Sequence, residues 1–537
     1  MTPRRLAFLV LGLEALLLLA GQWGRDLMTM DDLREAEVAR EMSTDGSYVI
    51  PHLAGLPFVE KPPGFQMVVA GLFTLLGGPS ILAARLVSAA FALAALVSVY
   101  LLGATAYGPR GGVLAGAFLA FSPLFVRVSH EILLDNALLA AMGWTFYFLF
   151  RALTEPEMGP KRRAYAAAAL ALGISFLVKG LVGPSLVGAG FVTFLIVSRR
   201  WNELRGAIHV YPATAFLAPC LVWIIPFLRA APRELVEEFF IKNQFGRFFQ
   251  AYASHARPFY FYLQTIGYKL GLAVFFLPGA WWVAWRDRKK PEALNGLVLA
   301  ALGAGPFLLL SLSKAKDAVY LLPVYPAFSV AAAGWGLRVF AHDSRAARGL
   351  AGFVLAVGVG VALAAGIVTA RLGGLTLGVA FLGVIFLPLG LSLFLALSRR
   401  DAESAGAGVA AFLAVGGLLW MTGPIARYEA TRQEWRASLP VILRATEGKE
   451  LLLFRPDDEI RGAYGFYRSR TALELNRPID FVQRLGDHAD TLGLVVWQGP
   501  ALPMELLEAS RALSRTLVER TRAKYYDKEL IVVSAAP

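Results

Sequence analysis

The sequence has little charge and almost no cysteine. Only 17% of its 537 residues are charged, against about 25% in soluble domains, and the mean hydropathy is +0.56. These values exclude an ordinary soluble domain, a disordered chain and a fibrous protein. The single cysteine, Cys220, excludes an intrachain disulfide framework. The sequence also lacks an internal repeat and a low-complexity tract. Apolar residues make up 57% of the chain, which indicates a polytopic, α-helical membrane protein.

Apolar runs of the length that crosses a bilayer, about 17–25 residues, recur as far as residue 425. A further apolar stretch, 62–78, is flanked by proline and glycine at both ends, which favours an interfacial or re-entrant helix. Segment 6–23 follows two arginines and precedes no clear cleavage site, so we expect an uncleaved anchor. We predict thirteen transmembrane helices, at 6–23, 80–105, 111–127, 130–151, 164–178, 180–198, 208–229, 259–285, 293–312, 318–340, 349–370, 374–397 and 405–425.

The positions of the basic residues predict the orientation of these spans. With the N-terminus in the cytoplasm, the cytoplasmic connections hold 19 basic residues and the short external connections hold five. This is the asymmetry that the positive-inside rule expects. Counting 62–78 as a full span would invert every later loop. The net charge of +13 is therefore mostly a signal of topology, and it does not indicate a nucleic-acid partner.

Three regions are expected outside the membrane. Two are long loops, at about 24–61 and 230–258. The third begins near residue 427 and has the size of a small domain. It alternates short apolar runs, typical of strands, with helical patterns. The runs are 451–454, 494–497 and 530–533, and one helical pattern covers 504–513. We predict a transmembrane domain over 1–426 and an external α/β domain over 427–537.

Acidic residues open the first external loop. Asp31 and Asp32 precede a charged helical pattern, and aspartate caps the N-termini of helices. Capping is one interpretation of both residues. The other is that Asp31 is a carboxylate beside a membrane-proximal cavity, where it acts as a general base or binds a metal or a cationic group. Arg34 is expected as its near neighbour.

Opposite charges end the same loop. Glu60 and Lys61 precede two prolines that fix an extended backbone. They form either a surface salt bridge of little energy or a rigidly held ammonium for a lipid phosphate, with Glu60 free to bind a metal. The second long loop is rich in aromatic residues, most of which are typical of an aromatic belt at the membrane interface. Such a belt does not account for Arg247 or His255. Arg247 is a further candidate for phosphate, and His255 with Glu60 would suit a divalent metal such as zinc, manganese or magnesium.

Charged residues also stand at the external ends of later spans. Glu131 and Asp135 are four residues apart, so we expect them on one face of a helix. An aspartate followed by a long apolar run is unfavourable if it faces lipid, which makes Asp135 a candidate site residue. Lys314 and Lys316 open another span. Lysines at span ends commonly snorkel, but two on the side that is poor in basic residues also suit a phosphate or diphosphate headgroup.

These segments resemble one known family. Residues 31–42 and Glu60-Lys61-Pro62-Pro63 are similar to the first external loop of bacterial GT-C glycosyltransferases, in the aminoarabinose transferase and protein mannosyltransferase group. The segment 239–262 and the pattern Lys314-x-Lys316-x-x-x-Tyr320 follow in the same order. The resemblance covers about residues 1–340. The sequence departs from the family pattern at two sites. Asn243-Gln244 replaces a common Glu-His, and Phe58 replaces the tyrosine typical of aminoarabinose enzymes. Neither sugar nor acceptor is therefore fixed.

The resemblance implies a GT-C fold in the bacterial inner membrane, a periplasmic active site and a polyprenyl-phosphate-linked sugar donor. The sugar would pass, with inversion, to a periplasmic lipid, protein or glycan. Carried over by position, Asp31 is the catalytic carboxylate and Asp135 the second acid. The residues expected to contact phosphate or the lipid carrier are Arg34, Lys61, Lys314, Lys316, Tyr320 and Arg247. The expected metal ligands are Glu60 and His255.

Two other functions compete with a glycosyltransferase. A transporter of a lipid or anionic substrate would also place charges in the membrane, but the odd span count and the missing repeat are untypical of such a protein. A non-catalytic membrane scaffold with a periplasmic binding domain would tolerate alanine at Asp31, Lys61 and Asp135 together. For the enzyme, the cations neutralise the leaving phosphate and Asp31 takes the proton of the acceptor hydroxyl.

Overall fold

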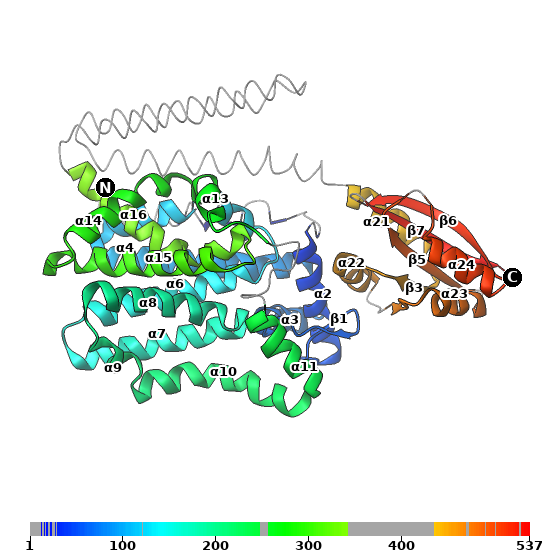
Figure 1. Ribbon diagram of the computed structural model, residues 1–537, viewed down its shortest axis with the longest axis horizontal. Coiled ribbons are helices and arrows are strands. Elements are labelled where there is room, and N and C mark those ends of the chain that lie inside the picture. Colours follow the sequence, from blue (N-terminus) through cyan, green and yellow to red (C-terminus); the bar gives the residue numbers. More distant parts are fainter. Residues whose placement is uncertain are drawn as a thin grey trace, which may run out of the picture. The chain divides into compact units, whose positions relative to one another are not determined.

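A computed structural model shows how the chain is organised (Figure 1). It describes residues 12, 15–16, 18–19, 22–23, 27, 29–120, 122–246, 256–341, 434–468, 472–488, 490–499, 501–525 and 528–536. The chain forms two compact units. The first comprises Met1–Arg25, Val59–Val68 and Leu82–Thr422, and the second comprises Asp26–Phe58, Val69–Ile81 and Gly423–Pro537. The predicted spans 349–370, 374–397 and 405–425 lie outside the described residues.

The first unit is a bundle of apolar helices. Helix α7 packs against α6 and α10, and α15 packs against α8 and α16. Among the described residues, five helices are long and apolar enough to cross a membrane. The larger helices are α4 (Ile81–Ala120), α6 (Asp135–Thr154), α7 (Met158–Lys179), α8 (Val182–Ser198), α10 (Val210–Ala230), α13 (Phe261–Leu270), α14 (Leu277–Arg286), α15 (Leu294–Leu312) and α16 (Tyr325–Ala341). The short elements are α5 (Pro123–Ser129), α9 (Glu203–Ala207), α11 (Arg233–Glu237), π-helix η1 (Glu238–Gly246) and the 3-10 helices η3 (Gly271–Phe275), η4 (Pro291–Ala293) and η5 (Ala318–Val324).

Several span boundaries differ from the prediction. The spans 80–105 and 111–127 share the label α4, but α4 consists of two helices separated by a break at Gly108-Pro109, where Gly108 has a φ of 79°, so the predicted division is confirmed and only the end of the second span differs. Proline has no backbone N–H to donate to the preceding turn, and the φ of Gly108 is not helical, so the first of the two helices ends there. This element ends at Ala120, and α5 follows as a separate helix capped by the side chain of Ser122. The predicted span 259–285 is also divided, into α13, η3 and α14. The short stretch at 62–78 forms α3 (Gly64–Leu76), as expected for a broken helix.

The second unit contains a five-stranded mixed sheet in the order β4-β3-β5-β7-β6. The strands are β3 (Glu450–Phe454), β4 (Leu473–Glu474), β5 (Thr491–Trp497), β6 (Thr516–Tyr525) and β7 (Lys528–Ala536). Strand β3 pairs in parallel with β4 and β5, and β7 pairs antiparallel with β5 and β6. Helices α23 (Pro478–Asp487) and α24 (Met504–Ala512) bury Phe481, Leu485 and Leu506 against the sheet. The three strands and the helix predicted from apolar runs are confirmed, whereas β4 and β6 were not predicted.

The loop predicted at 24–61 folds largely with this sheet domain, in the same unit. It forms α2 (Met30–Asp45) and a hairpin of β1 (His52–Leu53) and β2 (Leu56–Pro57). Helix α2 packs against α22 (Asp458–Arg468), while α21 (Glu434–Ala445) packs against β6. Two glycines of α22 permit the close approach: a Cβ at Gly462 would lie 2.9 Å from the backbone of Leu33, and one at Gly465 would overlap the Glu37 carboxylate. The polar helix α2 is buried for this reason.

Candidate functional site

The start of α2 separates the roles of the two adjacent aspartates. Thr29, not an aspartate, is the N-cap: its hydroxyl accepts the backbone N–H of Asp32 at 3.0 Å. The Asp32 carboxylate in turn accepts the backbone N–H of Thr29 at 3.3 Å, which completes a capping box. Asp32 is 1% exposed and therefore has a structural role. Asp31 takes no part in the box, and its side chain is 42% exposed.

Asp31 is held by a cation one turn along the same helix. Its Oδ1 accepts a hydrogen bond from Nη2 of Arg34 at 2.5 Å. The Arg34 guanidinium also lies 5.6 Å from the centre of the Phe58 ring, so ring and carboxylate both orient it. The prediction that Arg34 neighbours Asp31 is confirmed. The arrangement presents an accessible carboxylate whose position is fixed by a charge-assisted hydrogen bond.

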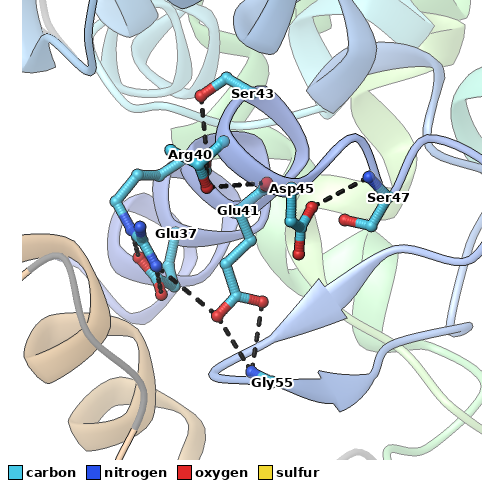
Figure 2. Close-up of polar contacts among 8 residues, drawn as sticks. Glu37, Arg40, Glu41, Ser43, Asp45, Ser47 and Gly55 are labelled. Carbon is cyan, nitrogen blue, oxygen red and sulfur yellow. Dashed lines mark hydrogen bonds and ion pairs between the residues drawn. The ribbon is translucent and has the colours of Figure 1, made fainter.

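Farther along α2 toward its C-terminus lies a buried cluster of charged side chains, Glu37, Arg40 and Glu41 (Figure 2). Arg40 donates to both Glu37 oxygens, through Nε at 2.7 Å and Nη2 at 2.8 Å. Its Nη2 also lies 3.6 Å from Glu41, whose two oxygens accept the N–H of Gly55 at 3.0 and 3.2 Å. Burial raises the pKa of Glu37 to about 8, and burial also raises the pKa of Glu41. The cluster therefore ties the hairpin tip to α2.

In the transmembrane unit, Asp135 forms a buried ion pair. Its Oδ1 lies 2.6 Å from Nζ of Lys179, at the end of α7, and the two side chains are only 5% and 10% exposed. The same ammonium lies 5.2 Å from the centre of the Tyr320 ring in η5. Three elements that are distant in sequence thus place an acid, a cation and a phenol together. A buried carboxylate requires such a partner.

The segment before Asp135 is not helical, which corrects one prediction. Helix α6 begins at Asp135, so Glu131 does not share a helical face with it and instead lies 3.8 Å from Arg127. The turn is fixed by buried polar contacts. Arg85 donates to the carbonyl of His130, and Asn136 donates to that of Val128 at 2.7 Å. These contacts hold Asp135 at the first turn of α6, where the helix dipole favours a negative charge.

Glu60 and Lys61 form an ion pair of 3.9 Å, with 25% and 15% of their side chains exposed. This contact is the salt bridge of the first interpretation, and Glu60 is not directed away from Lys61 as the second interpretation expected. The residue before them is anchored, because its carbonyl, that of Val59, accepts a hydrogen bond from Asn243 at 3.3 Å. The neighbouring Gln244 accepts the backbone N–H of Leu181 at 2.9 Å.

The π-helix η1 therefore organises two candidate segments of the transmembrane unit. Through Asn243 it contacts the residue before Glu60, and through Gln244 it contacts the turn that follows Lys179. Close packing adds to this link, since a Cβ at Gly64 would lie 2.6 Å from the carbonyl oxygen of Leu177. The segment of Lys61 and the end of α7 are thus neighbours.

The two lysines near residue 315 differ in environment. Lys314 is exposed, whereas Lys316 is 4% exposed. Lys316 Nζ donates to the carbonyl of Arg257 at 3.3 Å and to that of Ser313. Its ammonium is thus engaged by backbone carbonyls. A single β-bridge between Ala256 and Ala315 joins this turn to the end of the second long loop.

Two predicted residues, Arg247 and His255, lie outside the described residues. Among the residues that the structure describes, no three histidine, cysteine or acidic side chains gather in a way that would hold a metal. The described donors therefore do not make up a metal centre.

Sequence reasoning missed Lys179, Asn243 and Gln244. Lys179 carried a usable signal, because it is one of only five basic residues in the short external connections. Its partner Asp135 is 44 residues away, and no local pattern links the two. Asn243 and Gln244 had been noted only as departures from the family pattern. Their contacts with Val59 and Leu181 show that amides at these positions fix the backbone.

Comparison with known proteins supports the resemblance at the level of sequence. The family of dolichyl-phosphate-mannose-protein mannosyltransferases matches residues 60–225. The undecaprenyl phosphate-alpha-4-amino-4-deoxy-L-arabinose arabinosyl transferase of Edwardsiella ictaluri is 28% identical over 328 residues, which cover 60% of this chain and 58% of that protein. The enzyme of the same name from Erwinia tasmaniensis is 30% identical over 356 residues, or 65% of this chain and 62% of that protein. The chain thus spans less than two thirds of these relatives.

The fold is similar over nearly the whole chain to a solved structure. ArnT from Cupriavidus metallidurans, bound to undecaprenyl phosphate, superposes with a TM-score of 0.78 at 18% identity, covering 98% of this chain and 97% of that one. Its apo state gives a TM-score of 0.74 at 19% identity. The chain therefore has the GT-C fold, with apolar helices and a C-terminal sheet domain. The predicted fold class and resemblance are confirmed, while the number of spans and their orientation remain predictions.

Proposed function

We propose that this chain, a GT-C-fold protein similar to the aminoarabinose transferases, moves a sugar from undecaprenyl phosphate to a periplasmic acceptor in the bacterial inner membrane. The supporting observation is the set of acid–cation pairs at Asp31–Arg34, Glu60–Lys61 and Asp135–Lys179. Asp31–Arg34 and Glu60–Lys61 lie in segments that resemble that family. Asp135–Lys179 lies beside Tyr320, which belongs to another such segment. The relatives' names specify a polyprenyl-phosphate donor, and phosphate needs cations of this kind.

In this proposal the cations of the transmembrane unit receive the donor phosphate. Lys61 is 15% exposed, and Glu60 is a loose partner at 3.9 Å, so a phosphate can replace that carboxylate. Tyr320, beside Lys179, offers a hydroxyl to the same anion. Lys314 is exposed and is suited to bind oxygens of the donor phosphate. Lys316 instead stabilises its own turn by donating to backbone carbonyls. Arg34, Arg247 and Asp135 keep the roles that the resemblance assigns to them.

The chemical step is a displacement at the anomeric carbon. The acceptor oxygen forms a bond to that carbon while the bond from the carbon to the phosphate oxygen breaks, so the configuration inverts. Undecaprenyl phosphate leaves with its negative charge stabilised by the cations. Asp31 accepts the proton of the acceptor hydroxyl. Its exposed carboxylate is held by Arg34, which keeps it oriented for this transfer.

An aspartate-to-asparagine change at Asp31 tests the chemical role. Lipid A, surface glycans and periplasmic proteins are compared by mass spectrometry in cells that lack the gene and in cells that express each variant. We expect Asp31→Asn to abolish the sugar addition that the wild-type chain restores, at equal protein level. Asp45→Asn is the matched control, because Asp45 is exposed at the other end of α2. Full activity of Asp31→Asn would exclude the carboxylate as the base.

The same comparison identifies the acceptor class, which is a lipid A-like glycolipid, a protein or another glycan. Loss of a sugar from one class when the gene is absent assigns that acceptor. Uptake of an anionic substrate into proteoliposomes without any glycosylated product would instead support a transporter. We also propose that Glu60 and His255 bind a divalent metal. Loss of transfer in a chelator, restored by zinc or manganese, would support this metal site, and unchanged transfer would exclude it.

A further inference from the structure

A cavity of about 510 Å³ lies in the second unit, and none of its lining residues is among those proposed to contact the donor. One wall is the hairpin tip, residues 54–56, and the other is formed by Lys449, Glu450, Tyr464 and residues 472–474. Its volume is typical of sites for small molecules, which range over about 300–1,000 Å³.

The hairpin wall is held in a strained conformation. Ala54 and Gly55, the two residues between the paired Leu53 and Leu56, both have positive φ, 55° and 78°. A two-residue hairpin turn of this kind requires positive φ at both positions, and alanine adopts it unfavourably. Glu41 holds the turn through the Gly55 N–H. Backbone strain that the surrounding structure maintains is common at ligand sites.

The opposite wall presents polar groups in fixed positions. Glu474 accepts Nε and Nη2 of Arg461 at 2.8 and 2.9 Å and the Asn476 amide at 2.7 Å. Its charge is therefore already neutralised, and unused lone pairs remain for a hydroxyl donor. Lys449 and Glu450 add one charge of each sign, and each has a partner outside the lining, Lys449 with Asp490 and Glu450 with Arg484 at 3.8 Å. The wall thus favours neither a phosphate, which needs excess positive charge, nor a cationic group.

Apolar groups complete the lining. Leu56 and Leu473 are 47% and 46% exposed, and Tyr464 belongs to the same wall. A nearly neutral cavity with fixed hydrogen-bonding groups and apolar surface matches a carbohydrate, whose hydroxyl edges alternate with apolar C–H faces. We propose that this cavity binds an uncharged sugar segment of the acceptor, so that the external unit selects a glycan-bearing acceptor. The assignment to an acceptor rests on the proposed transfer reaction, whereas the carbohydrate site does not.

Direct binding to the full-length chain in nanodiscs tests the site. Maltotetraose, mannotetraose and N-acetylchitotetraose are titrated by calorimetry, each with inorganic phosphate as competitor. The cavity-filling variant is Ala472→Trp, at a half-exposed position, and Met504→Trp is its control, because Met504 is exposed on α24 outside the cavity. Glu450→Gln is a milder second variant that preserves volume.

We expect at least one saccharide to bind, with tenfold or greater weakening in Ala472→Trp, threefold or greater weakening in Glu450→Gln, and no change in Met504→Trp or with phosphate. Absence of binding by all three saccharides would overturn the proposal, as would binding that Ala472→Trp leaves unchanged or that phosphate abolishes. Because the assay needs no donor and no transfer, saccharide binding can persist if the transferase proposal fails. Conversely, sugar transfer can persist even if calorimetry detects no saccharide binding to the cavity.

Discussion

Replacing Glu37 by glutamine should remove a pH dependence from the stability of α2. Burial raises the pKa of Glu37 to about 8, against 4.5 for a free side chain, although the hydrogen bonds from Arg40 oppose this shift. The charged groups that affect the pKa of Glu37 are Arg40, which lowers it, and Glu41, which raises it. On the packed helix α22, the residue next to the Glu37 carboxylate is Gly465, which is uncharged. Folded α2 therefore holds a proton that the opened segment releases at neutral pH.

The sign follows from this difference in proton binding. A raised pKa of an acid makes the folded form more stable at low pH, and that stability is lost as the pH rises toward about 8. One group changes stability by at most about 1.4 kcal/mol per pH unit. Between pH 5.5 and 7.5 the expected loss is about 2.5 kcal/mol for pKa values of 8 and 4.5.

Amide hydrogen exchange of the full-length protein measures this loss locally. After correction for the intrinsic exchange rate, the opening free energy of the peptide that spans residues 37–56 should fall by about 2.5 kcal/mol between pH 5.5 and 7.5. Glu37→Gln, an isostere of the protonated acid, should show no such fall. Glu508→Gln, an exposed control on α24, should behave like the wild type. An equal pH slope in wild type and Glu37→Gln would refute the reasoning.

Three further predictions concern the transmembrane unit. Asp135→Asn or Lys179→Met alone removes one partner of a buried ion pair, so each should lower stability by about 3–5 kcal/mol. The double variant should regain most of that stability in thermal unfolding and still lack transfer, and additive losses would contradict the coupling of the pair. Gln244→Ala frees the Leu181 N–H, which costs about 1–3 kcal/mol, and should reduce transfer. Gln244→Glu keeps an acceptor oxygen and should retain transfer, so equal loss in both variants would argue against this positioning role. Glu60→Gln should weaken zinc binding by the full-length protein and reduce transfer, because Glu60 is one of the two proposed metal ligands; zinc binding equal to that of the wild type would exclude this role.

Local patterns in the sequence were enough to predict much of the fold. Apolar runs at 451–454, 494–497 and 530–533 became β3, β5 and β7, because a strand buried on both faces needs a continuous apolar run. Hydropathy likewise located α7 and α10. It also placed the break at Gly108-Pro109, between the predicted spans 80–105 and 111–127. It could not locate the separate helix after Ser122, because that interruption lies within an apolar stretch.

The site was less predictable, since its contacts join distant segments. Asp31–Arg34 is one helical turn, and the sequence alone indicated that neighbourhood. Asp135–Lys179 joins two helices, and its recognition requires the packing of α6 on α7. Helix α2 was the largest surprise. Its charged sequence is typical of an exposed helix, yet Glu37 and Arg40 are buried because two glycines of α22 permit close contact.

Four acidic residues of the predicted external regions are paired with cations. Asp31, Glu37, Glu60 and Asp135 each have a cation within 4 Å. A donor phosphate that binds Lys61 must therefore replace a carboxylate, and not merely water. Such an exchange costs little at Glu60, whose partner is 3.9 Å away, and much more at Asp135, whose buried contact is 2.6 Å. We therefore expect a donor phosphate to displace the partly exposed Glu60 from Lys61 more readily than the buried Asp135 from Lys179.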